Sequence, residues 1–233
     1  MPRGDPKKSN FVLDEMMKNG RAFDQKTLMA KFDTAASAFG FCKALCVSWI
    51  KRKYRNEGFW EEWLTSPDEG IRKQAETAIC QMSRDEVVDV GVLNTYKGAA
   101  VGVSEPLYMD ALNAKKAWHM RYLKANGIVV TPQAGPTPID PVRMGREITQ
   151  TRGYQLLYLS SAKEAAHCIA IYSGRGDSLF FDPNFGELKE GAGFSSFLKL
   201  MDVTVDDYSL MFLLGGHGKL AQYRTEKIAS AVE

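Results

Sequence analysis

The hydrophobic positions in the first half of the chain recur every three to four residues, which is the spacing of an amphipathic helix. One predicted helix runs from Phe41 to about Arg55 and has a buried face made of Cys42, Cys46, Trp49 and Ile50. Two or three further helices fit residues 66–126, since Ser66, followed by Pro67, is a strong helix start and Gly127 is a stop signal. The first half is therefore predicted to be helical.

The second half has short apolar runs, rich in β-branched and aromatic residues. Four prolines between Pro132 and Pro141 mark the change. The runs predict strands at Tyr154–Ser160, His167–Ser173, Ser178–Asp182 and Tyr208–Leu214, with a short helix at Phe194–Met201. Helices followed by an antiparallel sheet predict an α+β fold, in which a cleft between the two halves is the expected place for a site.

Composition excludes several classes of protein. The chain has 233 residues, with 45% hydrophobic and 25% charged residues, as in ordinary globular proteins. A net charge of +2, without a basic run interleaved with aromatics, argues against a nucleic-acid partner. No apolar stretch approaches the ~20 residues of a membrane span. Residues 1–10 are polar, so no secretory signal peptide is expected.

The four cysteines are scattered and form no CxxC pair, which argues against a disulfide framework and favours a reducing compartment. Their spacing to the three histidines does not match a structural zinc site. We therefore expect no metal and no cofactor.

Cys42 has the placement of a reactive thiol. It follows Gly40 at the start of the predicted helix, where unpaired backbone N–H groups and the helix dipole favour a thiolate. The N–H of Cys42 could also bind an oxyanion. Cys46 lies one turn later and is expected to point into the core.

His167 and Asp182 are predicted to meet across a hairpin. If the turn is the two-residue Gly174-Arg175, the positions of paired residues sum to 349, which places His167 opposite Asp182. A longer loop would move the register by one or two places and still leave them near each other. A carboxylate beside an imidazole fixes its tautomer and stabilises its charged form.

Each of these residues also has an ordinary structural interpretation. A cysteine in an apolar helix usually belongs to the core, a histidine at a strand start is usually structural, and aspartate before proline is common in turns. Their joint agreement with chain order, helix start and hairpin register favours a nucleophilic cysteine site. His119 and His217 are the alternative bases.

Three sequence blocks resemble the YopT/AvrPphB family of papain-like cysteine proteases, effectors that bacteria deliver into other cells. The blocks are Gly40-x-Cys42-x-Ala44-Leu45 with Trp49-Ile50, Ala166-His167-x-Ile169-Ala170, and Phe180-Phe181-Asp182-Pro183-Asn184-Phe185-Gly186. By this resemblance the fold is papain-like α+β, Cys42 is the nucleophile, His167 the general base and acid, and Asp182 the orienting acid.

The resemblance departs from papain-like enzymes at the oxyanion site. Such enzymes usually carry an Asn or Gln a few residues before the nucleophile, and residues 34–41 contain neither. The candidate donors are therefore the Cys42 backbone and Ser37, the nearest polar side chain, with Gln25 or Asn184 from elsewhere.

The predicted organisation is a flexible or helical lead at residues 1–33, a protease domain at residues 34–222 and a tail at residues 223–233. The domain is expected to be helical to about residue 130 and a sheet from about residue 150. The resemblance implies secretion without a signal peptide and cleavage of a protein substrate in the cytoplasm of a target cell. A cognate chaperone or immunity protein is a further candidate partner.

Two other functions fit the same residues. A Cys-His-Asp triad also supports glutamine deamidation or acyl transfer to an amine, because all three reactions share a thioester intermediate. A non-catalytic interaction module is the third hypothesis.

Overall fold

The computed structural model describes residues 20–30, 41–99, 116–131, 136–161, 166–191, 194–216 and 218–231. The chain divides into two compact units. Unit 1 comprises Met1–Lys26 and Thr131–Ile228, and unit 2 comprises Thr27–Val130 and Ala229–Glu233. In the described part of the chain, no helix is both long enough and apolar enough to span a membrane.

Unit 2 contains the predicted helices. They are α3 (Cys42–Tyr54), a π-helical turn η2 (Trp60–Leu64), α4 (Glu69–Ala99) and a helix at residues 116–125, while α2 (Gln25–Met29) spans the unit boundary. Helix α4 packs against both α3 and η2. The helices predicted within residues 66–126 are thus described at residues 69–99 and 116–125. The helical prediction is confirmed for α3, α4 and residues 116–125, whereas residues 20–22 and 128–131 of the same part of the chain are strands.

The start of α4 differs from the sequence prediction by two residues. Asp68 rather than Ser66 caps the helix, since Asp68 Oδ1 accepts a hydrogen bond from the backbone N–H of Ile71 at 3.0 Å. Ser66 Oγ instead accepts from the backbone N–H of Asp68 at 3.2 Å. Both residues are good caps, so the pattern alone did not distinguish them.

The sheet has eight strands, seven of them in the order β1-β7-β6-β5-β4-β8-β2, with β3 also paired to β8. Its strands are β1 (Gly20–Ala22), β2 (Ile128–Thr131), β3 (Thr137–Pro138), β4 (Gly153–Ser161), β5 (Ala166–Ser173), β6 (Asp177–Asp182), β7 (Gly186–Gly191) and β8 (Leu220–Ala231). Every pairing with a described register is antiparallel, as predicted. The α+β prediction is confirmed.

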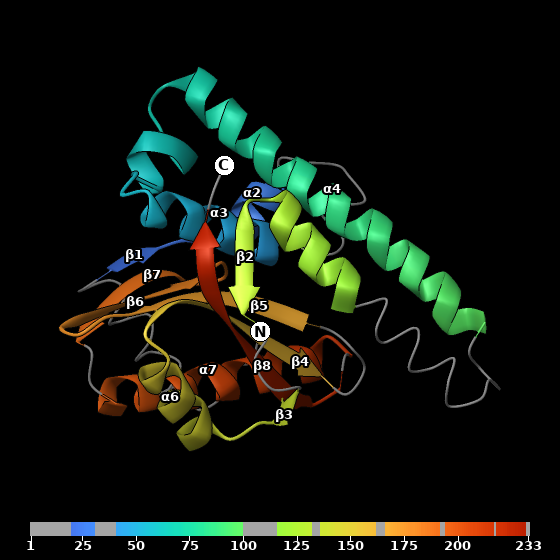
Figure 1. Ribbon diagram of the computed structural model, residues 1–233, viewed down its shortest axis with the longest axis vertical. Helices are drawn as coiled ribbons and strands as arrows, with labels where there is room; N and C mark the ends of the chain where they lie inside the picture. The colour runs from blue at the N-terminus through green and yellow to red at the C-terminus, as the bar shows by residue number, and fades with distance from the viewer. Residues whose placement is uncertain are drawn as a thin grey trace. The chain divides into compact units, whose positions relative to one another are not determined.

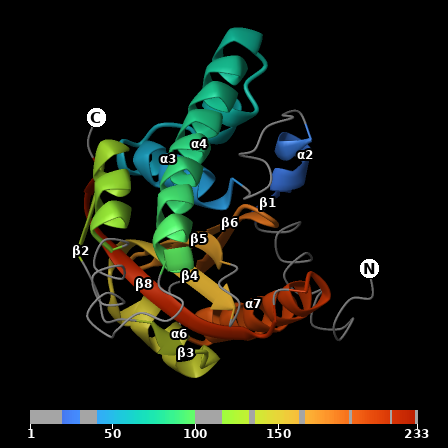
Figure 2. The same cartoon turned by 90° about the vertical axis from the view of Figure 1, so that its right-hand side faces the viewer.

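In unit 1, helices α6 (Pro141–Gln150) and α7 (Phe194–Leu214) pack against each other and cover one face of the sheet (Figures 1 and 2). Their apolar side chains join those of the strands in one core. Its members on the helices include Met144, Ile148, Met201, Val205, Tyr208 and Phe212, and those on the strands include Leu157, Ile169, Phe180, Leu188 and Tyr223. This core fixes α7 against β5 and β6, the strands that carry the predicted base and acid.

Three strand predictions hold and one is wrong. β4, β5 and β6 lie within one residue of the predicted ranges. Tyr208–Leu214, predicted as a strand, is the last part of α7. A short apolar run is ambiguous by itself, but Met201, Val205, Tyr208 and Phe212 are buried at spacings of four, three and four residues. That longer pattern is helical.

Seven of the described elements, among them the turn η2, were not predicted. Helix α6 carries a start signal that could have revealed it, because Asp140 caps it and Pro141 occupies the first turn. The strands β1, β2, β3, β7 and β8 are the other five. Strand β8 includes most of residues 223–233, which the sequence analysis placed in a tail, and β1 lies inside the predicted lead.

Candidate active site

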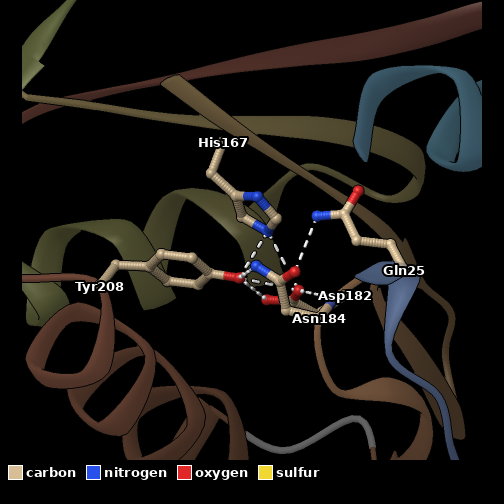
Figure 3. A network of polar contacts seen from close by, with 5 residues as sticks. All are labelled: Gln25, His167, Asp182, Asn184 and Tyr208. Atoms are coloured by element: carbon tan, nitrogen blue, oxygen red, sulfur yellow. Dashed lines mark hydrogen bonds and ion pairs between the residues drawn. The ribbon is translucent and has the colours of Figure 1, made fainter. Parts of the chain in front are cut away.

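His167 and Asp182 form a buried pair in unit 1 (Figure 3). Their side chains come from β5 and β6, and 3.0 Å separates His167 Nε2 from Asp182 Oδ1. His167 is 4% exposed and Asp182 is fully buried. The predicted proximity of these two residues is confirmed.

The predicted pairing of β5 with β6 is wrong: each residue of β5 pairs with a residue two positions later in β6 than predicted. Ser173 pairs with Ser178 and Ala170 with Phe181, so paired positions sum to 351 rather than 349. The Gly174 N–H donates to the Asp177 carbonyl at 2.9 Å, so the turn lies at Arg175-Gly176, one residue later than predicted. A shift of two positions preserves which face each residue occupies, so the pair survives as diagonal neighbours.

The turn after β6 orients the carboxylate. The Asn184 backbone N–H donates to Asp182 Oδ1 at 2.9 Å, and the Phe185 N–H donates to the Asp182 carbonyl at 3.0 Å. Asp182 thus forms an Asx-type turn, with Pro183 restricting the backbone between the two partners. These two hydrogen bonds orient the Asp182 carboxylate independently of its contact with His167.

Tyr208, which the sequence analysis did not connect with the site, completes it from α7. Its Oη lies 2.6 Å from His167 Nε2 and 2.9 Å from each carboxylate oxygen of Asp182. Asn184 Nδ2 donates to the same Oη at 2.9 Å, and Gln25 Nε2 donates to Asn184 Oδ1 at 2.7 Å. Figure 3 shows this continuous chain of polar contacts.

The partners determine the tautomer of His167. An ionised carboxylate accepts hydrogen bonds and cannot donate, so Nε2 carries the proton that faces Asp182 Oδ1. In the neutral imidazole, Nδ1 is then the nitrogen with the lone pair. His167 can therefore accept a proton at Nδ1 while Asp182 stabilises the resulting charge.

Cys42 begins α3 in unit 2. Phe41 precedes it without a side-chain cap, and the first turn has no acidic residue. The first intrahelical bond runs from the Leu45 N–H to the Phe41 carbonyl at 2.9 Å, so the N–H groups of residues 42–44 point out of the helix end. Cys42 is half-buried, whereas Cys46 is fully buried, as predicted.

The neighbouring Lys43 contributes little positive charge to the helix start. Its Nζ lies 3.1 Å from Glu86 Oε1 and above the rings of Tyr122 and Trp118, at 4.2 and 5.0 Å from their centroids. These contacts neutralise a buried cation and tie α3 to the rest of unit 2. The uncapped start of α3 is the described feature that favours a thiolate at Cys42.

The predicted triad residues lie in different units of the chain. His167 and Asp182 meet within unit 1, with Gln25 and Asn184 in the same network. Cys42 belongs to unit 2, so the triad itself stays a prediction.

Among the other named residues, His119 is buried in unit 2, while Ser37 and His217 lie outside the described residues. All four cysteines are free thiols. Within the described ranges, no group of three or more His, Cys, Asp or Glu side chains is arranged to hold a metal ion.

Comparison with known proteins supports the resemblance seen in the sequence. A Peptidase C58 family model, described as Yersinia/Haemophilus virulence surface antigen, matches residues 114–201, which is less than half of the chain. The matched range contains His167 and Asp182 but neither Cys42 nor Tyr208. The similarity to YopT/AvrPphB-type cysteine proteases is thereby confirmed.

A search of solved structures finds the Pseudomonas avirulence protein AvrPphB. Its structure shares 15% sequence identity with this chain at a TM-score of 0.48, covering 85% of this chain and 99% of that one. No curated protein sequence matches the chain.

Proposed function

We propose that the chain is a papain-like cysteine endopeptidase that uses Cys42, His167 and Asp182. The observation that carries the proposal is the buried His167–Asp182 pair, in which Nε2 is occupied by its acidic partner at 3.0 Å. This leaves Nδ1 as the basic nitrogen. The half-buried Cys42 at an uncapped helix start supplies a matching nucleophile.

In the proposed reaction, His167 Nδ1 takes the thiol proton of Cys42, and the sulfur attacks a peptide carbonyl. The developing oxyanion is bound by the N–H of Cys42 and, as the second candidate, by Ser37. His167 then gives its proton to the leaving amine, and water hydrolyses the thioester. Asp182 stays ionised and stabilises the imidazolium.

The proposed setting follows from the same resemblance. The substrate is a protein of a target cell, reached by secretion without a signal peptide, and the enzyme acts in the cytoplasm of that cell. The catalytic cleft is proposed to lie between the helical and sheet parts, within a protease domain of residues 34–222. A cognate chaperone or immunity protein remains a candidate partner.

The test is a search for new protein termini in target-cell lysate treated with wild-type protein, Cys42→Ala or Cys46→Ala. Wild type and Cys46→Ala are expected to produce the same cuts, and Cys42→Ala none. Cys46 is the matched control because it lies one turn later in the same helix and is fully buried. Loss of cutting in Cys46→Ala alone would refute the assignment of the nucleophile.

Mass spectrometry of the modified protein separates the alternatives. A cut chain indicates proteolysis, a gain of about 1 Da indicates deamidation, and a crosslink indicates acyl transfer. A thiol probe that ignores Cys42 at neutral pH would favour a non-catalytic interaction module.

A further inference from the structure

The hydroxyl of Tyr208 lies within hydrogen-bond distance of His167 Nε2, of both carboxylate oxygens of Asp182 and of Asn184 Nδ2. We propose that Tyr208 is a positioning residue: it fixes the imidazole ring and the carboxylate relative to each other through one hydroxyl. The inference rests on the proposed function for its effect on catalysis. Its effect on the geometry of the pair can be measured separately.

The ring of Tyr208 is held from three directions. It stacks on the His167 ring with centroids 4.3 Å apart and planes 24° apart. The Phe185 ring meets it edge-on at 6.2 Å, and Phe212, one turn later in α7, lies at 6.0 Å. With 1% of its surface exposed, Tyr208 has little freedom to rotate. The position of Oη is therefore set by packing.

The hydrogen-bonding capacity of Oη matches its surroundings. A phenol has one proton and two lone pairs. Since an ionised carboxylate only accepts, the proton goes to Asp182, whose oxygens both lie at 2.9 Å. The lone pairs accept from Asn184 Nδ2 at 2.9 Å and face His167 Nε2 at 2.6 Å.

This arrangement does two things for the pair. Asp182 gains a donor besides the Asn184 backbone N–H, which compensates a fully buried carboxylate. The Nε2 proton of His167 faces two acceptors, Asp182 Oδ1 and Tyr208 Oη, so rotation of the ring would lose both. The ring is thereby kept with Nδ1 directed away from Asp182.

Tyr223 provides a matched control in the same unit. It is also 1% exposed, and its Oη donates to Glu147 Oε2 at 2.9 Å. Tyr223→Phe and Tyr208→Phe therefore each keep a buried ring and remove one hydroxyl bonded to a carboxylate. They differ in whether that carboxylate belongs to the proposed active site.

The first measurement is the rate at which iodoacetamide alkylates Cys42 at neutral pH, together with kcat/KM once a substrate is in hand. Tyr208→Phe is expected to lower both by about 10- to 100-fold, the range found for the outer partners of metal-bound histidines, with KM nearly unchanged. Tyr223→Phe is expected to leave both unchanged. Thermal unfolding of each variant confirms that it folds.

The second measurement is independent of catalysis. The chain has three histidines, so the ring signals of His167 in ¹⁵N NMR can be assigned with a His167→Gln variant. Wild type is expected to show the Nε2–H tautomer, with a proton that exchanges slowly with water. Tyr208→Phe is expected to speed this exchange about tenfold, and Tyr223→Phe to leave it unchanged.

The outcomes separate the two proposals. Faster exchange with slower alkylation in Tyr208→Phe supports the positioning role. If Cys42 of the wild-type protein does not react with iodoacetamide, the proposed function is overturned. Faster exchange of the Nε2 proton in Tyr208→Phe would still support the positioning role in that case. If Tyr208→Phe changes neither exchange nor alkylation, Tyr208 is an ordinary core residue and the positioning role is overturned.

Discussion

Asp182 contacts His167 as a diagonal neighbour on the same face of the sheet, with 3.0 Å between Oδ1 and Nε2. The same Oδ1 accepts the backbone N–H of Asn184 at 2.9 Å, whereas the Tyr208 hydroxyl is the one described partner of Oδ2 and lies 2.9 Å from both oxygens. The two carboxylate oxygens are therefore not equivalent. Oδ1 contacts the imidazole and a backbone N–H, and Oδ2 contacts the Tyr208 hydroxyl.

This asymmetry predicts that Asp182→Asn retains more activity than Asp182→Ala. The Asn184 N–H requires an acceptor at the Oδ1 position, so the new amide places its oxygen there and its NH₂ toward Tyr208. The oxygen still accepts from His167 Nε2, and the tautomer is preserved. Asp182→Ala removes every one of these bonds and should lower kcat/KM by about 10²–10⁴-fold.

The measurement is kcat/KM of both variants, or alkylation of Cys42 if no substrate is known. The unfolding free energy of Asp182→Ala should also fall by about 1–3 kcal/mol for each buried donor left without an acceptor. An Asp182→Asn variant as inactive as Asp182→Ala would mean that the charge, rather than the position, dominates.

The proximity of His167 and Asp182 was predictable because it depends only on whether the error in register is an even or an odd number of residues. An error of two positions in the sum leaves both side chains on one face, whereas an error of one would have moved Asp182 to the other face. The predicted turn is wrong, and the predicted contact between His167 and Asp182 is nevertheless correct. Short apolar strands bounded by Gly and Asp gave enough information for this part of the site.

The contribution of Tyr208 was not predictable by the same reasoning. Its segment was assigned to a strand, and the residue lies 26 positions from Asp182 in the sequence. Contact between them depends on how α7 packs on the sheet, which no local pattern specifies. Gln25 presents the same difficulty, since its partner Asn184 is 159 positions away.

Gln25 is expected to support the site indirectly, because it binds Asn184, which in turn binds Tyr208. Its Nε2 donates to Asn184 Oδ1 at 2.7 Å and its backbone N–H to the Pro183 carbonyl, also at 2.7 Å. Gln25→Ala removes the first bond and keeps the second. The unfolding free energy should fall by about 1 kcal/mol. Alkylation of Cys42 should slow by less than in Tyr208→Phe.

Gln81→Ala is the control, because Gln81 Nε2 donates to Asp85 at 2.8 Å on an exposed part of α4. Its unfolding free energy should stay within about 0.5 kcal/mol of wild type. Equal losses in the two variants would contradict a supporting role for Gln25.

Cys80 is expected to make stability depend on alkaline pH. Burial raises the pKa of this thiol above its ordinary value; the nearby Glu76 adds to the increase and Arg84 opposes it. As pH rises, the unfolded chain therefore loses the thiol proton before the folded chain does. Below the pKa of the thiol in the unfolded chain, Cys80 does not make stability depend on pH. Between that pKa and the higher pKa of the folded chain, the unfolding free energy falls by at most about 1.4 kcal/mol per pH unit.

The check is urea unfolding of wild type and Cys80→Ala between about pH 7 and about pH 10. The variant begins less stable because it loses buried volume, but its stability should fall less steeply with pH. Parallel slopes in the two proteins would show that the Cys80 thiol ionises equally well when folded.

Gly186 of β7 pairs with Ala22 of β1, and its substitution should disturb both strands. Its φ of 120° is rare for residues with a side chain. A Cβ there would collide with the Arg21 carbonyl oxygen and lie 2.7 Å from the Phe23 backbone nitrogen. Both are main-chain atoms that cannot rotate away. Gly186→Ala must therefore displace β1 and the segment that carries Gln25.

Gly153→Ala is the control for Gly186→Ala, because it introduces the backbone strain of a positive φ without a collision. Gly153 has a φ of 97°, but a Cβ there would meet nothing within 4 Å. Both variants should lose about 1–3 kcal/mol of unfolding free energy through the unfavourable φ. Gly186→Ala should lose more, by at least about 1 kcal/mol for the broken contacts, and should also slow alkylation of Cys42. Equal losses, with unchanged alkylation, would show that the chain at residues 20–26 does not support the His167–Asp182 pair.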